Sequence, residues 1–228
     1  MAGLATLGGE GAASAQDWST IVLPDQTPSR FDLWTGAYIG SKSWSAYSGV
    51  TLALFGPIDG DGWRLRAVGG YGAYEDERSG SVSFADILLG YQKQYDALTL
   101  KAFAGVTAAD DLARIDGENA MSGPDCGFKG IFEGWLNMTE RSWASLDLVW
   151  SSTHDGHQRL RVGFAVWPNL SLGLEAEATG RADSDGQRGG AFVRYTWAGA
   201  EITASGGTAL DSSLATGAFG TVVVLARF

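Results

Sequence analysis

Apolar and polar residues alternate with a period of two along much of this chain. The segment 170–178 shows this most clearly. Its leucines and alanines would lie on one side of an extended chain, and its serine, glycine and glutamates on the other. Such alternation is typical of a β-strand with two different faces. The pattern recurs at 63–71, 143–151, 159–166 and 191–197. Because no helical period extends beyond two turns, the pattern predicts an all-β protein.

Twelve segments are predicted to be strands, and their connections indicate how they are joined. The strands are 31–40, 45–55, 62–74, 84–95, 97–108, 128–138, 142–152, 157–167, 169–180, 188–197, 199–208 and 217–228. Tight turns at 95–97, 139–141, 167–169 and 197–199 alternate with mostly longer connections at 75–83, 109–127, 153–156, 181–187 and 209–216. This alternation is typical of an antiparallel up-and-down transmembrane β-barrel with periplasmic turns. An even strand number then places both the N and C termini on the periplasmic side.

The two faces of these strands favour a membrane barrel over a soluble one. One face is apolar and rich in Ala and Gly, which fill a thick core poorly. Twelve strands also enclose a lumen too wide for that face to fill. We therefore expect the apolar face to contact outer-membrane lipid and the charged face to line the lumen. The expected lumen-lining residues are Arg64, Arg66, Lys101, Glu133, Asp147, Arg159, Arg161, Glu175, Glu177, Arg194, Glu201 and Arg227, with Asp32, Asp86 and Lys129 on the same face.

The last segment, 217–228, is predicted to close the barrel. Every second residue back from Phe228 is apolar or small, and the chain ends on that aromatic residue. We expect this strand to pair with 31–40, which leaves no open sheet edge. Phe228 would then lie in an aromatic girdle at the membrane interface and serve as the assembly signal for the barrel-insertion machinery.

Other aromatic residues extend this prediction. Trp63, Tyr95, Trp167 and Trp197 stand at the turn ends of their strands, where a periplasmic girdle would lie. Five other tryptophans are less uniformly placed, and ordinary strand packing is an equal alternative for them. They are Trp34, Trp44, Trp135, Trp143 and Trp150.

Composition changes the picture at the N-terminus and in the choice of partners. Residues 1–16 contain Ala13-Ser14-Ala15 before Gln16, which fits a signal-peptide remnant whose start lies upstream or has been trimmed. Residues 17–30 are expected to be an irregular lead-in, and 31–228 the barrel. The net charge of −10 argues against nucleic-acid binding. Cys126 is the only cysteine, so it is expected to be a free thiol in a loop.

Glycine and aromatic motifs in the first third resemble a known family. They are the run from Phe31 to Tyr38, Ser45 to Gly49, Gly62 to Arg66, Gly69 to Tyr74, and the later Gly90-Tyr91-Gln92. Together they resemble the cellulose biosynthesis protein BcsS family across most of residues 31–228. The resemblance implies a bacterial outer-membrane accessory protein of cellulose synthesis, and it implies no catalytic or binding residues.

Candidate chemistry is sparse. His154, Asp155 and His157 could hold a metal, although Asp155-Gly156 is a common turn dipeptide and an exposed turn explains the group more simply. Ser151, Ser152 and His154 could supply part of a lipid-modifying triad. The acidic loop 109–127, which carries Asp110, Asp111, Asp116, Glu118 and Asp125, lacks EF-hand spacing and is expected to be solvated. Glu175 and Glu177 lie about 7 Å apart along one strand. That spacing loosely fits a glycosidase pair, but arginine partners in the lumen explain it more simply.

These observations predict an outer-membrane β-barrel of a Gram-negative bacterium, accessory to cellulose biosynthesis or export. Its role is expected to be structural or pore-like and not catalytic, with no cofactor or metal. Cellulose synthase or export components and the glucan chain are the expected partners, and Trp44, Tyr47 and Tyr74 are candidate glucan contacts. The alternatives are a lipid-modifying enzyme, a passive small-solute channel and a soluble β-barrel binding module.

Overall fold

The computed structural model describes residues 29–228 except 76–78, 116–117, 122–123, 154–155, 182–183 and 211–215. Thirteen strands occur in this part of the chain. They are β1 (Phe31–Gly40), β2 (Ser43–Ala53), β3 (Gly62–Tyr74), β4 (Gly80–Tyr95), β5 (Leu98–Ile115), β6 (Glu118–Met121), β7 (Asp125–Asn137), β8 (Ser142–Ser151), β9 (Gly156–Trp167), β10 (Leu170–Arg181), β11 (Ser184–Trp197), β12 (Ala200–Leu210) and β13 (Thr216–Arg227). Within the described residues, no helix is long and apolar enough to cross a membrane. The predicted signal-peptide remnant and most of the predicted lead-in lie outside the described residues.

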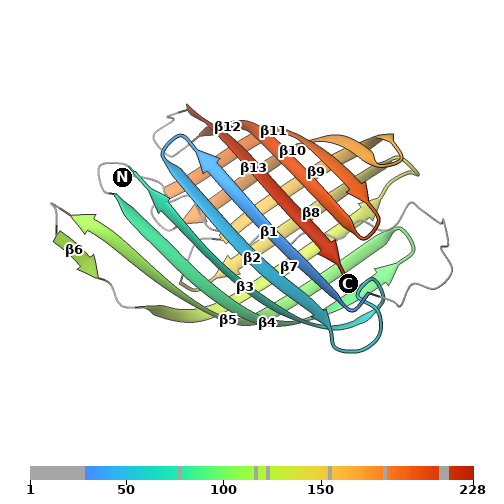
Figure 1. Cartoon of the computed structure of the whole chain (residues 1–228), viewed down its shortest axis with the longest axis horizontal. Coiled ribbons are helices and arrows are strands. Elements are labelled where there is room, and N and C mark those ends of the chain that lie inside the picture. Colours follow the sequence, from blue (N-terminus) through green and yellow to red (C-terminus); the bar gives the residue numbers. More distant parts are fainter. Residues whose placement is uncertain are drawn as a thin grey trace.

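Twelve of the strands form one closed antiparallel barrel, which confirms the predicted fold (Figure 1). Each strand pairs with its sequence neighbours, with one exception. β5 pairs with β7, and β6 pairs only with residues 112–115 at the end of β5. β13 pairs with β1 from Asp32↔Arg227 to Gly40↔Phe219, so the expected closure is confirmed. Phe228 donates its N–H to the carbonyl of Phe31 at 3.0 Å. We call the end of the barrel that holds these two residues the terminal end, and the opposite end the loop end.

The predicted loop at 109–127 was largely wrong. β5 runs to Ile115, the hairpin strand β6 follows, and β7 begins at Asp125. Asp110 and Asp111 therefore lie in a strand that pairs with β4 as far as Gly80↔Ala113. The strand ladder satisfies the backbone of these acidic residues, and both side chains are half-buried, with Asp111 accepting a hydrogen bond from the Tyr74 hydroxyl. The connection expected at 181–187 is also shorter, since β10 and β11 leave only 182–183 between them.

One pair of connections departs from the alternation of short turns and long loops. β1 and β2 are joined at the loop end by Ser41 and Lys42 alone. β2 and β3 are joined at the terminal end by residues 54–61, the longest described connection there. The predicted strands 31–40, 45–55 and 62–74 had left 41–44 and 56–61 for these two connections, so the structure shortens the first and lengthens the second by two residues each.

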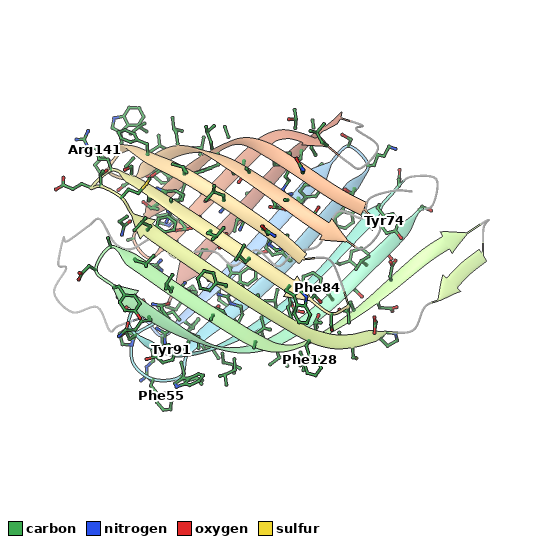
Figure 2. The ribbon with its side chains drawn as sticks, turned by 180° about the vertical axis from the view of Figure 1, so that it is seen from behind. Phe55, Tyr74, Phe84, Tyr91, Phe128 and Arg141 are labelled. Atoms are coloured by element: carbon green, nitrogen blue, oxygen red, sulfur yellow. The ribbon has the colours of Figure 1, made fainter. Side chains whose placement is uncertain are left out.

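The two faces of the wall differ as the alternation predicts. Outward side chains are apolar and exposed, as at Leu174, which is 70% exposed, and inward side chains are buried, as at Glu133, which is 2% exposed. Figure 2 shows Phe55, Tyr91 and Phe128 projecting from the outside of the molecule. An exterior of exposed apolar side chains around a closed sheet is the surface that a lipid bilayer stabilises.

Aromatic residues form a girdle at the terminal end. The five residues expected there are all exposed, namely Trp63, Tyr95, Trp167, Trp197 and Phe228. The Phe228 ring stacks on Phe31 with centroids 5.2 Å apart, and Trp63 meets Tyr91 edge to face at 5.4 Å. The remaining tryptophans divide, because Trp44 and Trp150 point outward while Trp34, Trp135 and Trp143 point into the barrel.

Candidate functional site in the barrel interior

The structure places the twelve expected lumen residues on the inward face of their strands. Arg64 and Arg66 come from β3, Lys101 from β5, Glu133 from β7, Asp147 from β8, Arg159 and Arg161 from β9, Glu175 and Glu177 from β10, Arg194 from β11, Glu201 from β12 and Arg227 from β13. Asp32, Asp86 and Lys129 lie on the same face. Because each strand contributes alternate residues, one charged set gathers inside from nearly the whole circumference.

Ion pairs between adjacent strands line the wall. The pairs are Arg159–Asp147 at 3.1 Å, Arg161–Glu175 at 3.1 Å, Arg188–Glu177 at 2.6 Å, Arg194–Glu201 at 2.6 Å and Arg227–Asp32 at 3.6 Å. Four of the five join residues directly opposite each other in the strand register. Opposite charges at such positions stabilise the pairing of the two strands. Arg188 was missed in the sequence, where glycines follow it and no strict alternation marks its face.

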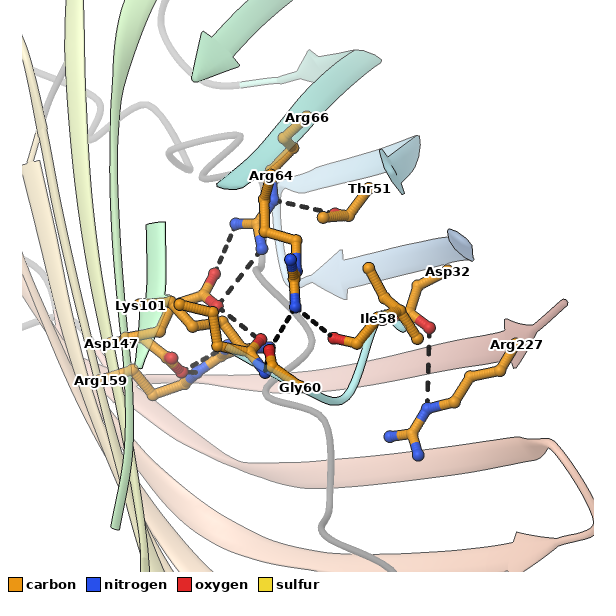
Figure 3. Close-up of polar contacts among 12 residues, drawn as sticks. Asp32, Thr51, Ile58, Gly60, Arg64, Arg66, Lys101, Asp147, Arg159 and Arg227 are labelled. Atoms are coloured by element: carbon orange, nitrogen blue, oxygen red, sulfur yellow. Dashed lines mark hydrogen bonds and ion pairs between the residues drawn. The ribbon is translucent and has the colours of Figure 1, made fainter. Parts of the chain in front are cut away.

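Other ion pairs reach across the interior and skip intervening strands. Arg66 of β3 donates to both carboxylate oxygens of Glu133 on β7, at 2.5 and 3.3 Å. Lys101 of the neighbouring strand β5, directly opposite Glu133 in the register, approaches the same carboxylate at 3.9 Å. Lys129 of β7 binds Asp86 of β4 at 2.6 Å. Figure 3 shows Arg64, Arg66, Lys101, Asp147 and Arg159 gathered in one region, with Asp32 and Arg227 near them. The Arg66–Glu133 and Lys129–Asp86 pairs thus join strands that are three and two positions apart in the sheet.

Aromatic side chains share the interior with the charges. Trp135 and Trp143 stack with ring centroids 4.1 Å apart, and Phe192 of β11 meets Trp143 at 5.5 Å. The Arg194 guanidinium lies 5.0 Å from the Trp135 ring centroid, which is within cation–π range. A second cluster near the closing strands contains Trp34, Tyr47, Val68, Val223 and Leu225, with Phe84 against it. The interior is therefore both charged and aromatic, whereas only its charges were predicted.

Inward glycines make room for these rings. Seven interior aromatics pack against a glycine that is directly opposite in the strand register. The pairs are Trp34–Gly49, Tyr47–Gly36, Phe84–Gly70, Tyr74–Gly80, Phe103–Gly90, Trp143–Gly163 and Phe192–Gly173. A Cβ at any of these glycines would collide with the ring. At Gly70, the ring of Phe84 occupies the space that a Cβ would fill.

The three aromatics proposed to touch glucan do not form one surface. Trp44 faces outward and meets Tyr71 at 5.8 Å, whereas Tyr47 is buried inside against Trp34. Tyr74 lies near the loop end, where its hydroxyl donates to Asp111 at 3.3 Å. Trp44 and Tyr47 face opposite sides of the wall, because residues an odd number apart in a strand point to opposite faces.

The other candidate groups lie at the loop end or inside the wall. His154 and Asp155 lie outside the described residues, and His157 is buried on β9. Ser152 Oγ accepts the N–H of Phe128 at 2.8 Å, and Ser151 shares a hydrogen bond with Thr153. Cys126 is an exposed free thiol at the start of β7 and not in a loop. Among the described residues, no group of three or more His, Cys, Asp or Glu is placed to hold a metal.

Comparison with protein families identifies the chain. The family described as cellulose biosynthesis protein BcsS matches residues 33–228. The chain belongs to this family. A search of curated protein sequences found no match. The BcsS match covers β1 to β13, so the barrel as a whole is the family's domain in this chain.

Solved structures share the fold of this BcsS family member. The translocator domain of the autotransporter NalP from Neisseria meningitidis is 13% identical with a TM-score of 0.56, over 90% of each chain. The β domain of the Bordetella autotransporter BrkA is 14% identical with a TM-score of 0.56, over 89% of this chain and 100% of that chain. A KdgM porin is 10% identical with a TM-score of 0.49, over 86% and 99%. The two autotransporter domains show that the chain has the fold of an outer-membrane barrel.

Proposed function

We propose that this BcsS family member is an outer-membrane β-barrel accessory to cellulose biosynthesis or export, with a structural or pore-like role and no catalysis. The observation that carries the proposal is the family match over a barrel with an apolar exterior and a charged interior. The exterior fits lipid, and the interior offers hydrogen-bonding groups along the barrel axis. A glucan chain is rich in hydroxyl groups and needs such a lining to cross a bilayer.

Three kinds of partner follow from this role. Outer-membrane lipid contacts the exposed apolar face. Cellulose synthase or export components, or the glucan chain itself, meet the barrel at one of its ends. The interior aromatic rings add apolar faces of the kind on which sugar rings stack, although these rings are buried against glycines in the structure.

Cellulose at the cell surface tests the proposal. Removing the gene should lower surface cellulose, while glucan synthesis by isolated inner membranes stays unchanged, because the barrel acts after polymerisation. The wild-type gene should restore surface cellulose. Fractionation should find the protein with outer membranes, in a form whose gel migration changes on boiling. Normal surface cellulose in the deletion strain would contradict the role, and a protein in the soluble fraction would contradict the location.

We also propose that both chain termini lie in the periplasm and that the barrel-insertion machinery recognises Phe228 during assembly. The short connections at 96–97, 168–169 and 198–199 share the terminal end with the aromatic girdle, which supports this orientation. Deleting Phe228 removes its stack on Phe31 and its backbone bonds to β1, so the amount of folded protein in the outer membrane should fall severalfold. Phe219→Ala, which removes an inward ring from the same strand, is the matched control. Normal outer-membrane levels of the truncated chain would refute the assembly role.

A passive small-solute channel is the second candidate, favoured by the charged lining alone. Swelling of proteoliposomes in small neutral sugars would support it if surface cellulose were also independent of the gene.

A further inference from the structure

The connection of residues 54–61 folds back toward the barrel interior at the terminal end, where the inward residues Arg64 and Gln92 bind its carbonyls. Two of its apolar side chains have opposite environments, since Phe55 is 71% exposed and Ile58 is 4% exposed. An apolar side chain in a surface connection is buried only where the connection folds back onto the structure. The N–H of Ile58 also bonds the carbonyl of Ser29 at 2.8 Å, at the start of the described chain. The connection is therefore an ordered cover and not an open loop.

Arg64 holds this cover from inside the wall. Its guanidinium donates to the carbonyls of Pro57 at 3.1 Å, Ile58 at 3.0 Å and Gly60, and Figure 3 shows it directed at the last two. Arg64 is 1% exposed, and its described hydrogen bonds all go to backbone carbonyls. The other inward arginines of the described chain bind carboxylates. Arg64 thus differs from the other inward arginines, because three of its hydrogen bonds go to the 54–61 connection.

The end of β4 supplies a second set of contacts. Gln92 donates to the carbonyl of Gly60 at 2.9 Å, and Gln94 donates its side chain to the carbonyl of Asp59. Asp61 accepts from Lys93 and from the N–H of Gln94, and these two donors lower the pKa of the Asp61 carboxyl. Because Asp61 and Lys93 are both well exposed, their ion pair stabilises the connection little, and the buried Arg64 contacts matter most.

We infer that residues 54–61 form a gate at the terminal end, that Arg64 holds it closed, and that a neutral glucan chain releases it. The inference rests on the proposed function, since a gate has a purpose only where something passes. Carbonyl oxygens are neutral acceptors, and so are the hydroxyls of a glucan. A chain that enters at this end can take over the Arg64 donors as the carbonyls leave, so the buried charge never loses its partners. The carboxylate-bound arginines offer no such exchange, because a hydroxyl replaces a carboxylate poorly.

Thiol labelling tests the gate directly. In a Cys126→Ser background, Thr99→Cys places a probe on an inward, buried position directly opposite Gln94. A membrane-impermeant maleimide should label this cysteine slowly in the purified barrel. Arg64→Ala should raise the labelling rate severalfold, Arg64→Lys should raise it less, and Gln92→Ala should raise it least. Arg161→Ala, which removes an inward arginine bound to Glu175, should leave the rate unchanged.

The outcomes separate the gate from the proposed function. Unchanged labelling in an Arg64→Ala barrel that still shifts on boiling overturns the gate. If that variant does not fold, Gln92→Ala decides, and no increase there also overturns it. Adding a cello-oligosaccharide to the wild-type gate should raise the labelling rate, and no change would overturn glucan as the releasing ligand. Gated labelling together with normal surface cellulose in the deletion strain would leave the gate standing and remove the cellulose role.

Discussion

Phe132 and Glu133 are consecutive residues of β7 with opposite environments. Phe132 is exposed on the outer face, where any apolar side chain is compatible with the bilayer. Glu133 is buried inside, where its carboxylate forms ion pairs with both Arg66 and Lys101. The outer face therefore depends on composition, since hydrophobic contact has no direction. The inner face depends on particular partners, since an unpaired buried charge is costly.

The largest effect is expected where an inner charge loses its partner. Glu133→Ala leaves Arg66 and Lys101 facing each other in the interior and should lower the free energy of unfolding by about 3–5 kcal/mol. Phe132→Ala, one residue away on the lipid face, is the matched control and should cost less. Urea titration of the barrel in lipid vesicles measures both. Equal losses at the two positions would mean that the two faces do not differ in this way.

An intermediate effect is expected from a charge on the outer face, and it should depend on depth. Leu174→Arg puts a guanidinium into the middle of the apolar band and should cost about 2–4 kcal/mol of unfolding free energy. Val166→Arg lies beside the girdle residue Trp167, where the side chain can reach the interface, and should cost about 0–1 kcal/mol. The same titration gives the difference, and a similar cost at both depths would argue against a bilayer around this face.

The smallest of the three effects tests the fit between inward rings and glycines. Gly163→Ala drives a methyl group into the Trp143 ring and should cost about 1–3 kcal/mol through overpacking. Gly69→Ala is the control on the outer face, where the added methyl meets only ordinary contact. Loss of near-ultraviolet tryptophan dichroism in the Gly163 variant alone would report the displaced ring. No loss of stability at Gly163 would show that the ring can move aside.

The strand order and the two faces could be predicted because they depend on local alternation. β1, β3 and the closing strand matched expectation to within a residue, and so did the outward girdle. The continuation of β5 through Asp110 and Asp111 was missed, because charge marks exposure to water and says nothing about whether the backbone is still paired. The direction of Trp135 and Trp143 was left open by the sequence, because tryptophan suits either face of a barrel.

The sequence by itself determined that this chain is a closed sheet with one face for lipid and one for charge, since a period of two acts between neighbouring residues. Only the tertiary structure decided which charges meet, which rings lie over which glycines, and where the 54–61 connection goes. Those features join residues as far apart as Arg66 and Glu133 or Trp143 and Phe192. Which residues meet depends on the stagger between strands and on the curvature of the closed wall. Neither quantity can be inferred from the pattern of a single strand.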